Sequence, residues 1–251
     1  MSYVVVLMAA FIAGAINSVA GGGTLVSFPA LIWVGLPSTI ANATSTVAIW
    51  PGSLGAMFGY RKDLGGLPTS TYALIVPSLL GGIIGAVLLV MTPTEVFDKL
   101  IPLLILFATI LFMLQESVQR LVKTTGKAHS GSKGWLIGAV LFQFAVAVYG
   151  GYFGAGIGIL MLAAFGIMGF TDIHQMNGLK NFLALCINGV AAAYFIWNGM
   201  VSWPHALLMA VGAIFGGVWG AGVARRIGPK AVRRVVIIVG FTMAISLLFK
   251  L

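Results

Sequence analysis

The sequence predicts an all-α polytopic membrane protein made of two inverted five-segment repeats, and three observations predict it. Hydrophobic residues make up 60% of the 251 residues and charged residues only 8%, whereas about a quarter of an average soluble domain is charged. Ten strongly apolar segments lie five on each side of a single polar linker. The two halves also match each other when one of them is shifted along the other.

The apolar segments follow one another with short connections. They run at about 3–20, 24–36, 39–60, 69–91 and 99–118, and then at about 134–153, 157–169, 173–197, 203–224 and 231–249. Residues 119–133 carry basic residues, Ser and Gly without apolar periodicity, so we expect a cytoplasmic linker between a first transmembrane repeat, 1–118, and a second, 134–251. No basic stretch precedes the first segment, so we expect it to be a retained helix.

A shift of 135 residues aligns the two halves without a gap. It superposes Ala20, Gly21, Gly23 and Leu25 on Ala155, Gly156, Gly158 and Leu160, Asn42 on Asn177, and Gly81, Gly82, Gly85 and Ala86 on Gly216, Gly217, Gly220 and Ala221. A glycine turn, an asparagine within an apolar segment and a GGxxGA helix thus match in one register. This coincidence predicts an internal duplication.

The charges predict the relative orientation of the two halves. The connection with Arg61 and Lys62 has no basic counterpart in the second half, and the acidic connection with Glu95 and Asp98 corresponds to the basic stretch Arg225–Arg234. Lys and Arg concentrate in cytoplasmic loops, so both basic connections and the linker are predicted to be cytoplasmic. The halves are then inverted, and both termini lie outside.

The second segment of each repeat is too short to span a bilayer. Residues 24–36 make a helix of about 20 Å, against a hydrocarbon core of about 30 Å. We therefore expect about eight full spans and two short helices, with the turns Gly21–Gly23 and Gly154–Gly158 inside the membrane. Irregular backbone at that depth lines a cavity or is buried in protein, and a helix N-terminus attracts an anion. The two turns are therefore the leading site candidates.

Lys180 is the one charge well inside an apolar segment. Burying an ammonium costs at least about 2.5 to 3.5 kcal/mol, so Lys180 either extends to the cytoplasmic surface or meets an anion in a cavity. The five acidic residues all lie at connections or helix ends. This distribution argues against cation transport and against catalysis by paired carboxylates.

The predicted substrate-binding residues lie on or beside the two turns, and most of them are hydrogen-bond donors. They are Asn17, Ser18, Gly21, Gly22, Gly23, Thr24, Asn42, Ser45, Thr46, Tyr149, Tyr152, Gly154, Gly156, Gly158, Asn177, Lys180 and Asn181, and Asn188 belongs to the same polar group. Thr44 and Ser53 are interpreted as bonded to their own helix. No metal site, disulfide or cofactor is expected, because Cys186 is the single cysteine and the three histidines show no ligand spacing.

Four runs of residues also resemble a known family. They are Ala15–Thr24 (AINSVAGGGT), Asn42–Thr46 (NATST), Gly154–Gly158 (GAGIG) and Asn177–Asn181 (NGLKN), and together they are similar to the sulfite exporter TauE/SafE family, also called the 4-toluene sulfonate uptake permeases. The resemblance covers nearly the whole chain. It implies secondary transport of sulfite, thiosulfate, sulfonates such as sulfoacetate or related organic anions across the bacterial plasma (inner) membrane, without ATP.

The expected function is therefore a secondary transporter of small anions that works by alternating access around a midplane site, and not an enzyme. An anion channel, an intramembrane enzyme and a membrane scaffold are the alternatives. The expected partners are a small anionic substrate and the lipid bilayer. A proton or another coupling ion is a further candidate partner, as is a second copy of the chain in a homodimer. Gly81xxxGly85 and Gly212xxxGly216xxxGly220 are interpreted as helix-packing surfaces, either internal or at a dimer contact. Nucleic acid is excluded because the basic residues lie in clusters between apolar segments.

Overall fold

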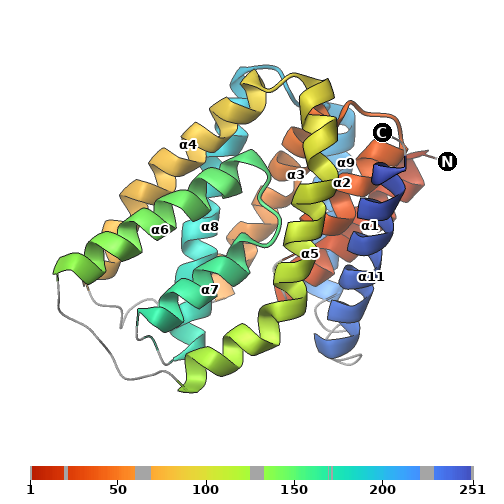
Figure 1. Cartoon of the computed structure of the whole chain (residues 1–251). Helices are drawn as coiled ribbons and strands as arrows, with labels where there is room; N and C mark the ends of the chain where they lie inside the picture. Colours follow the sequence, from red (N-terminus) through yellow and green to blue (C-terminus); the bar gives the residue numbers. More distant parts are fainter. Residues whose placement is uncertain are drawn as a thin grey trace.

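The computed structural model describes residues 2–19, 22–59, 69–124, 133–168, 170, 172–220 and 229–249, and within these ranges the chain is helical almost throughout, without a strand (Figure 1). The first half contains α1 (Ser2–Val19), α2 (Thr24–Trp33), α3 (Ser38–Gly59), the 3₁₀-helix η2 (Thr69–Leu74), α4 (Ile75–Met91) and α5 (Thr94–Thr124). The second half contains α6 (Lys133–Tyr152), α7 (Ile157–Ile167), α8 (Ile173–Trp197), α9 (Trp203–Phe215), the π-helix η3 (Gly216–Gly220) and α11 (Pro229–Leu248).

The all-α prediction is confirmed, and a helix lies at each predicted apolar segment. α5 differs most from its predicted segment, since it begins at Thr94 and continues to Thr124, past the apolar stretch and into the predicted linker. Gln, Arg, Lys and Leu are good helix formers, so the helix does not end where the hydrophobicity ends. The segment predicted at 203–224 changes from α to π geometry at Gly216, in a glycine-rich stretch where helix propensity is low.

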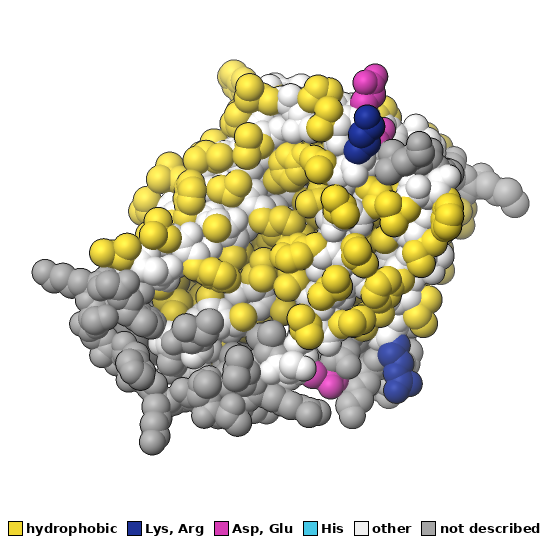
Figure 2. Space-filling view, in the orientation of Figure 1, with side chains coloured by type: hydrophobic (Ala, Val, Ile, Leu, Met, Phe, Trp, Pro, Cys, Tyr) yellow, Lys and Arg dark blue, Asp and Glu magenta, His cyan; other side chains and the backbone are white. Residues whose placement is uncertain are grey.

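Three helical stretches are long and apolar enough to cross a membrane, by length and composition. They are Thr71–Met91, Thr94–Ser117 and Gln175–Trp197. Large apolar side chains are exposed over the described surface, and hydrophobic side chains are spread over the described part of the face shown in Figure 2. A surface of this kind is typical of a protein that contacts lipid. The connections around Arg61 and Arg225, on which the predicted orientation depends, lie outside the described residues.

Glycines bring the long helices into close contact. α4 lies along α6, and α1 lies along α9 (Figure 1). A Cβ on Gly81 would lie 2.6 Å from Cβ of Ala147 on α6, and a Cβ on Gly212 would lie 2.8 Å from the Leu7 carbonyl oxygen on α1. Both contacts are tighter than side chains tolerate. The two glycine surfaces that could have served an internal or a dimer contact are therefore used inside the chain.

Substitution of Gly85 tests this packing. A Cβ on Gly85 would overlap the backbone of α6 at Val148 and Gly151, whereas a Cβ on Gly138 of the same helix pair meets nothing within 4 Å. Overpacking costs typically 1–3 kcal/mol, so we expect Gly85→Ala to lower the melting temperature in detergent by roughly 2–10 °C. Gly138→Ala is the matched control and should melt like the native chain. Equal melting temperatures for the two variants would contradict the close α4–α6 contact.

Candidate functional site

The second glycine turn, between α6 and α7, has a backbone conformation that requires glycine. Gly154 and Gly156 have φ angles of 81° and 82°, in the left-handed region that other residues enter only with strain. The Tyr149 hydroxyl donates a 2.7 Å hydrogen bond to the Ala155 carbonyl inside the turn. Tyr149 thus contacts the turn, and it is not among the residues that line the cavity described below.

The first glycine turn, between α1 and α2, is a close-packed contact. A Cβ on Gly23 would lie 2.5 Å from a carbonyl oxygen of α1, and a Cβ on Gly22 would enter the ring of Phe112 on α5. Gly21 and the side chain of Ser18 lie outside the described residues. The described glycines of this turn therefore allow close approach of helices and do not face the cavity.

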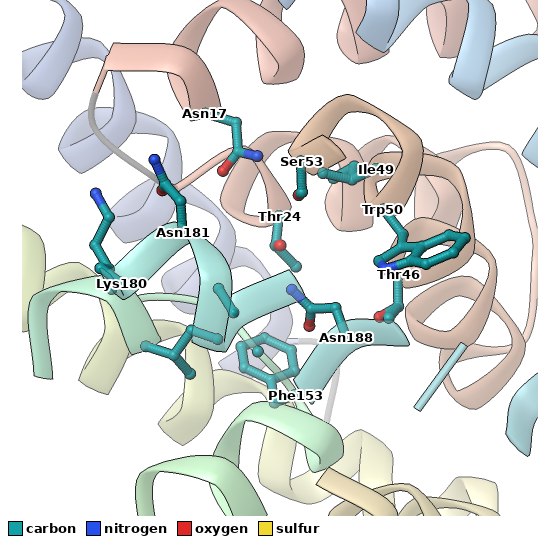
Figure 3. Close-up of a pocket in the computed structure, with 14 residues that line it drawn as sticks. Asn17, Thr24, Thr46, Ile49, Trp50, Ser53, Phe153, Lys180, Asn181 and Asn188 are labelled. Carbon is teal, nitrogen blue, oxygen red and sulfur yellow. The ribbon is translucent and has the colours of Figure 1, made fainter. Parts of the chain in front are cut away.

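A cavity of about 70 Å³ lies where the two turns and helices α3 and α8 meet (Figure 3). A cavity needs roughly 10–15 Å³ for one water molecule, so this one admits a small polyatomic ion. It is lined by Asn17, Thr24, Thr46, Ile49, Trp50, Ser53, Phe153, Gly154, Ile157, Gly158, Lys180, Asn181, Ala184 and Asn188. Seven of the seventeen predicted site residues thus lie around one cavity: Asn17, Thr24, Thr46, Gly154, Gly158, Lys180 and Asn181.

Two helix N-termini reach the cavity wall. Thr24 is the first residue of α2, and Ile157 and Gly158 are the first two residues of α7. The first amides of an α-helix have no acceptor within the helix, and the helix dipole places partial positive charge there. No side chain caps either N-terminus. The Leu25, Val26 and Ser27 amides donate to the Gly22 and Gly23 carbonyls, and the Ile159 amide donates to the Gly156 carbonyl. The two halves therefore bring the positive ends of two helices to the same cavity.

Lys180 supplies the charge of the cavity wall. Its Nζ donates a 3.0 Å hydrogen bond to Asn177 Oδ1, one helical turn before it on α8. Its aliphatic stem passes Gly158, where a Cβ would lie 3.1 Å from Lys180 Cδ. In Figure 3, Lys180 and Asn181 project from α8 on one side of the site, and Trp50 projects from α3 on the other. No carboxylate is among the lining residues.

Asn42 and Ser45 do not line the cavity, although both were predicted as site residues. Asn42 Nδ2 donates a 2.9 Å hydrogen bond to the Tyr152 carbonyl, and Ser45 Oγ lies 2.7 Å from Ser27 Oγ on α2. Both side chains are buried. Their hydrogen bonds join α3 to the end of α6 and to α2, so their observed contacts are between helices.

Three more predicted site residues do not line the cavity: Tyr152, Gly156 and Asn177. The Tyr152 hydroxyl is 3.4 Å from Thr92 Oγ1, and its ring lies edge-on to Phe97 with centroids 5.6 Å apart. Phe97 belongs to an aromatic cluster with Phe28 and Phe153. Phe153 is the ring of this cluster that lines the cavity, and Phe28 and Phe97 pack against it from the core.

Ile49, Ala184 and Ser53 line the cavity but were not predicted, and the repeat offset could have found them, because it relates each of them to another lining residue. Thr46 and Asn181, Ile49 and Ala184, and Ser53 and Asn188 all line the cavity, and the members of each pair are 135 residues apart. Trp50 Nε1 also donates a 3.2 Å hydrogen bond to the Leu185 carbonyl, 135 residues away. Ser53 thus lines the cavity, although it was not among the predicted site residues. Phe153 and Ile157 gave no signal, because an apolar residue beside a turn is usually core.

The histidines and the cysteine form no metal site in the part of the chain that the structure describes. His205 Nδ1 lies 2.8 Å from Ser202 Oγ, and its ring stacks on Tyr3. Cys186 is a free thiol on α8, and it is not among the lining residues.

Comparison with known proteins finds a matching family and several relatives. The model of the sulfite exporter TauE/SafE family matches residues 6–247. A probable membrane transporter protein of Haemophilus influenzae is 25% identical over 240 residues, which cover 95% of this chain and 91% of the relative. The probable membrane transporter protein ORF9 of Sinorhizobium is 27% identical over 96% of this chain and 90% of the relative. The probable membrane transporter protein YfcA of Escherichia coli K12 is 26% identical over 98% of this chain and 89% of the relative. No solved structure matches.

Cysteine labelling tests the contrast between lining and buried positions. In a Cys186→Ala background, we expect Asn181→Cys to react with a charged methanethiosulfonate reagent, because Asn181 lines the cavity. Ser45→Cys should react at least roughly tenfold more slowly, because Ser45 is fully buried and buried thiols are inert. Equal labelling rates in the folded, detergent-solubilised protein would contradict this assignment of the cavity wall.

Proposed function

The chain belongs to the sulfite exporter TauE/SafE family, and on that premise we propose that it transports small anions by alternating access around the cavity between α3 and α8. It is a membrane transporter and not an enzyme, because its family and its relatives are described as exporters and membrane transporters. The proposed substrates are sulfite, thiosulfate, sulfonates and related organosulfur anions. The proposed location is the bacterial plasma membrane.

The observation that carries this proposal is the sign of the charge around the cavity. Lys180 and the N-termini of α2 and α7 all present positive charge to it. The amides of Asn17, Asn181 and Asn188 and the hydroxyls of Thr24 and Ser53 add hydrogen-bond donors, whereas the Thr46 hydroxyl donates to the Asn42 carbonyl. Donors around a cationic site suit an oxyanion, and charge-assisted hydrogen bonds are about twice as strong as neutral ones.

Helix packing supports the inverted repeat on which alternating access depends. The 135-residue offset relates α1 to α6, α4 to α9 and α5 to α11. Contacts follow the same relation, because α4 packs on α6 while α1 packs on α9, and α5 packs on its own counterpart α11. The Trp50–Leu185 hydrogen bond then lies near the axis that relates the halves. A site on such an axis is typical of transporters with inverted repeats.

The cavity lies at the crossing of α3 and α8 and extends to Lys180, on the side of α8 that the sequence places toward the cytoplasm. Its lining residues run from Thr46 to Ser53 on α3 and from Lys180 to Asn188 on α8, and Lys180 lines it whereas its equivalent Ser45 does not. The hydrogen bonds of Asn42 and Ser45 and the ring of Phe97 lie on the other side. With the basic connections in the cytoplasm, this arrangement is an inward-facing state with a closed outer side, and both termini lie outside.

A channel is the second candidate, and the closed outer side disfavours it. A channel needs a continuous pathway, whereas Phe28, Phe97 and Phe153 are 0–2% exposed and pack edge-on across the outer side of the cavity. A carrier closes one side at a time by design. Saturable uptake that rises with substrate on the opposite side identifies a carrier, and unsaturable flux identifies a channel.

Transport assays with Lys180 variants test the proposed site. We expect proteoliposomes to take up at least one anion from a panel of sulfite, sulfate, thiosulfate, sulfoacetate and taurine. Lys180→Ala should reduce uptake at low concentration by about 10- to 100-fold, because a hydrogen bond to a charged group contributes about 1.5–3 kcal/mol. Lys180→Arg should retain more activity because it keeps the positive charge.

Lys99→Ala is the matched control, since Lys99 is an exposed lysine on α5. Its uptake should equal that of the native chain. Undiminished uptake by Lys180→Ala would remove Lys180 from the site. Flux of cations without anions would contradict the electrostatic basis of the proposal.

A further inference from the structure

The two halves treat one pair of equivalent positions differently. Ser45 on α3 and Lys180 on α8 are 135 residues apart and so occupy the same place in the two repeats. Ser45 is fully buried, with its Oγ 2.7 Å from Ser27 Oγ on the closed side. Lys180 instead lines the cavity. The first repeat thus shows the closed arrangement of this position, and the second repeat shows the open one.

Closure of the second repeat in the manner of the first moves Lys180 into the place that Ser45 occupies now. The position equivalent to Ser27 is Leu162, which is 3% exposed in the apolar core beside α8. In the closed first repeat a serine hydroxyl faces Ser27, whereas in a closed second repeat the ammonium of Lys180 would face Leu162. The closed position therefore offers the lysine an apolar neighbour where the serine has a polar one.

Asn177 offers Lys180 a single neutral acceptor on its own helix. Its counterpart Asn42 donates through Nδ2 to the Tyr152 carbonyl, and Asn42 Oδ1 has no hydrogen-bond partner in the described structure. In a closed second repeat, the same contact would run from Asn177 Nδ2 to the Asn17 carbonyl, because Asn17 is the repeat equivalent of Tyr152. Asn177 Oδ1 would then still accept from Lys180, as it does in this structure. One amide oxygen does not balance a full positive charge in a closed apolar site.

We propose that the protein changes conformation only when an anion is bound beside Lys180, and that it is therefore an obligatory anion exchanger. This inference rests on the proposed function and deepens it. Without an anion, closure must bury an uncompensated ammonium, which is the cost that makes a lysine rare in the middle of a membrane. A barrier of that size slows closure by a factor on the order of one hundred. With an anion, the charge is compensated at close range, and the loaded carrier closes in either direction.

Exchange and net uptake can be compared on the native chain. Proteoliposomes are loaded with unlabelled thiosulfate or left with buffer alone, and uptake of ³⁵S-thiosulfate is followed; ³⁵S-sulfite is used in a parallel series. Valinomycin and equal K⁺ on both sides prevent a voltage from limiting net flux. We expect uptake into loaded vesicles to be at least roughly tenfold faster, because only loaded carriers return.

The outcomes separate the two proposals. Equal uptake into loaded and empty vesicles would overturn obligatory exchange and leave anion transport intact. Rapid uptake into empty vesicles driven by a pH gradient would also overturn it, in favour of a lysine that returns without its proton. Uptake of neither probe under either loading would contradict the proposed function for these anions, and the exchange mechanism with it.

Two variants extend the test to the residue itself. Lys180→Gln keeps a polar side chain and removes the charge, so the advantage of loaded over empty vesicles should fall toward onefold at saturating anion. Lys99→Gln, on the exposed side of α5, should keep the full advantage. A Lys180→Gln protein that melts like the native chain and still requires internal anion would contradict the assignment of coupling to Lys180.

Discussion

The interruption of a helix inside an apolar bundle is the constraint from which the site follows. Backbone amides at such a break have no partner in lipid, so the break must face protein or a polar space. Here the breaks before Thr24 and Ile157 face one cavity, and they approach it from both halves of the chain. The glycines of the two turns serve this arrangement differently: Gly154 and Gly156 by positive φ, Gly22 and Gly23 by close packing.

α3 and α8 complete the cavity and relate its two sides. They cross at Trp50 and Leu185, and Trp50 also contacts Gly189, where a Cβ would lie 3.0 Å from its Nε1. In the proposed alternating-access mechanism, this contact near the axis would stay in place while the ends of each helix move. The hydrogen bonds at Asn42 and Ser45 then belong to one end of this crossing, and Lys180 belongs to the other.

The helices could be predicted from apolar runs, and the location of the site from the glycine turns, because both depend on local sequence. The partners of polar side chains could not. Asn42 and Ser45 are in the same motif as Thr46, yet only Thr46 faces the cavity. Helix periodicity predicts which residues share a face, but the conformational state of the bundle decides whether that face is open. Ser53 was missed because backbone bonding is the usual state of a serine in an apolar helix.

In the proposed transporter, selection at the wall of the cavity depends on the sign of the substrate's charge. Amides and hydroxyls donate and accept, so Asn17 or Thr46 alone would accept an ion of either sign. The discrimination comes from Lys180 and the two helix N-termini, which are all positive. Ile49, Trp50 and Phe153 add apolar surface to the wall, and a lower local dielectric strengthens each of these interactions. A cation at this place would meet three positive ends in a medium that screens them poorly, whereas a small oxyanion meets donors on several sides.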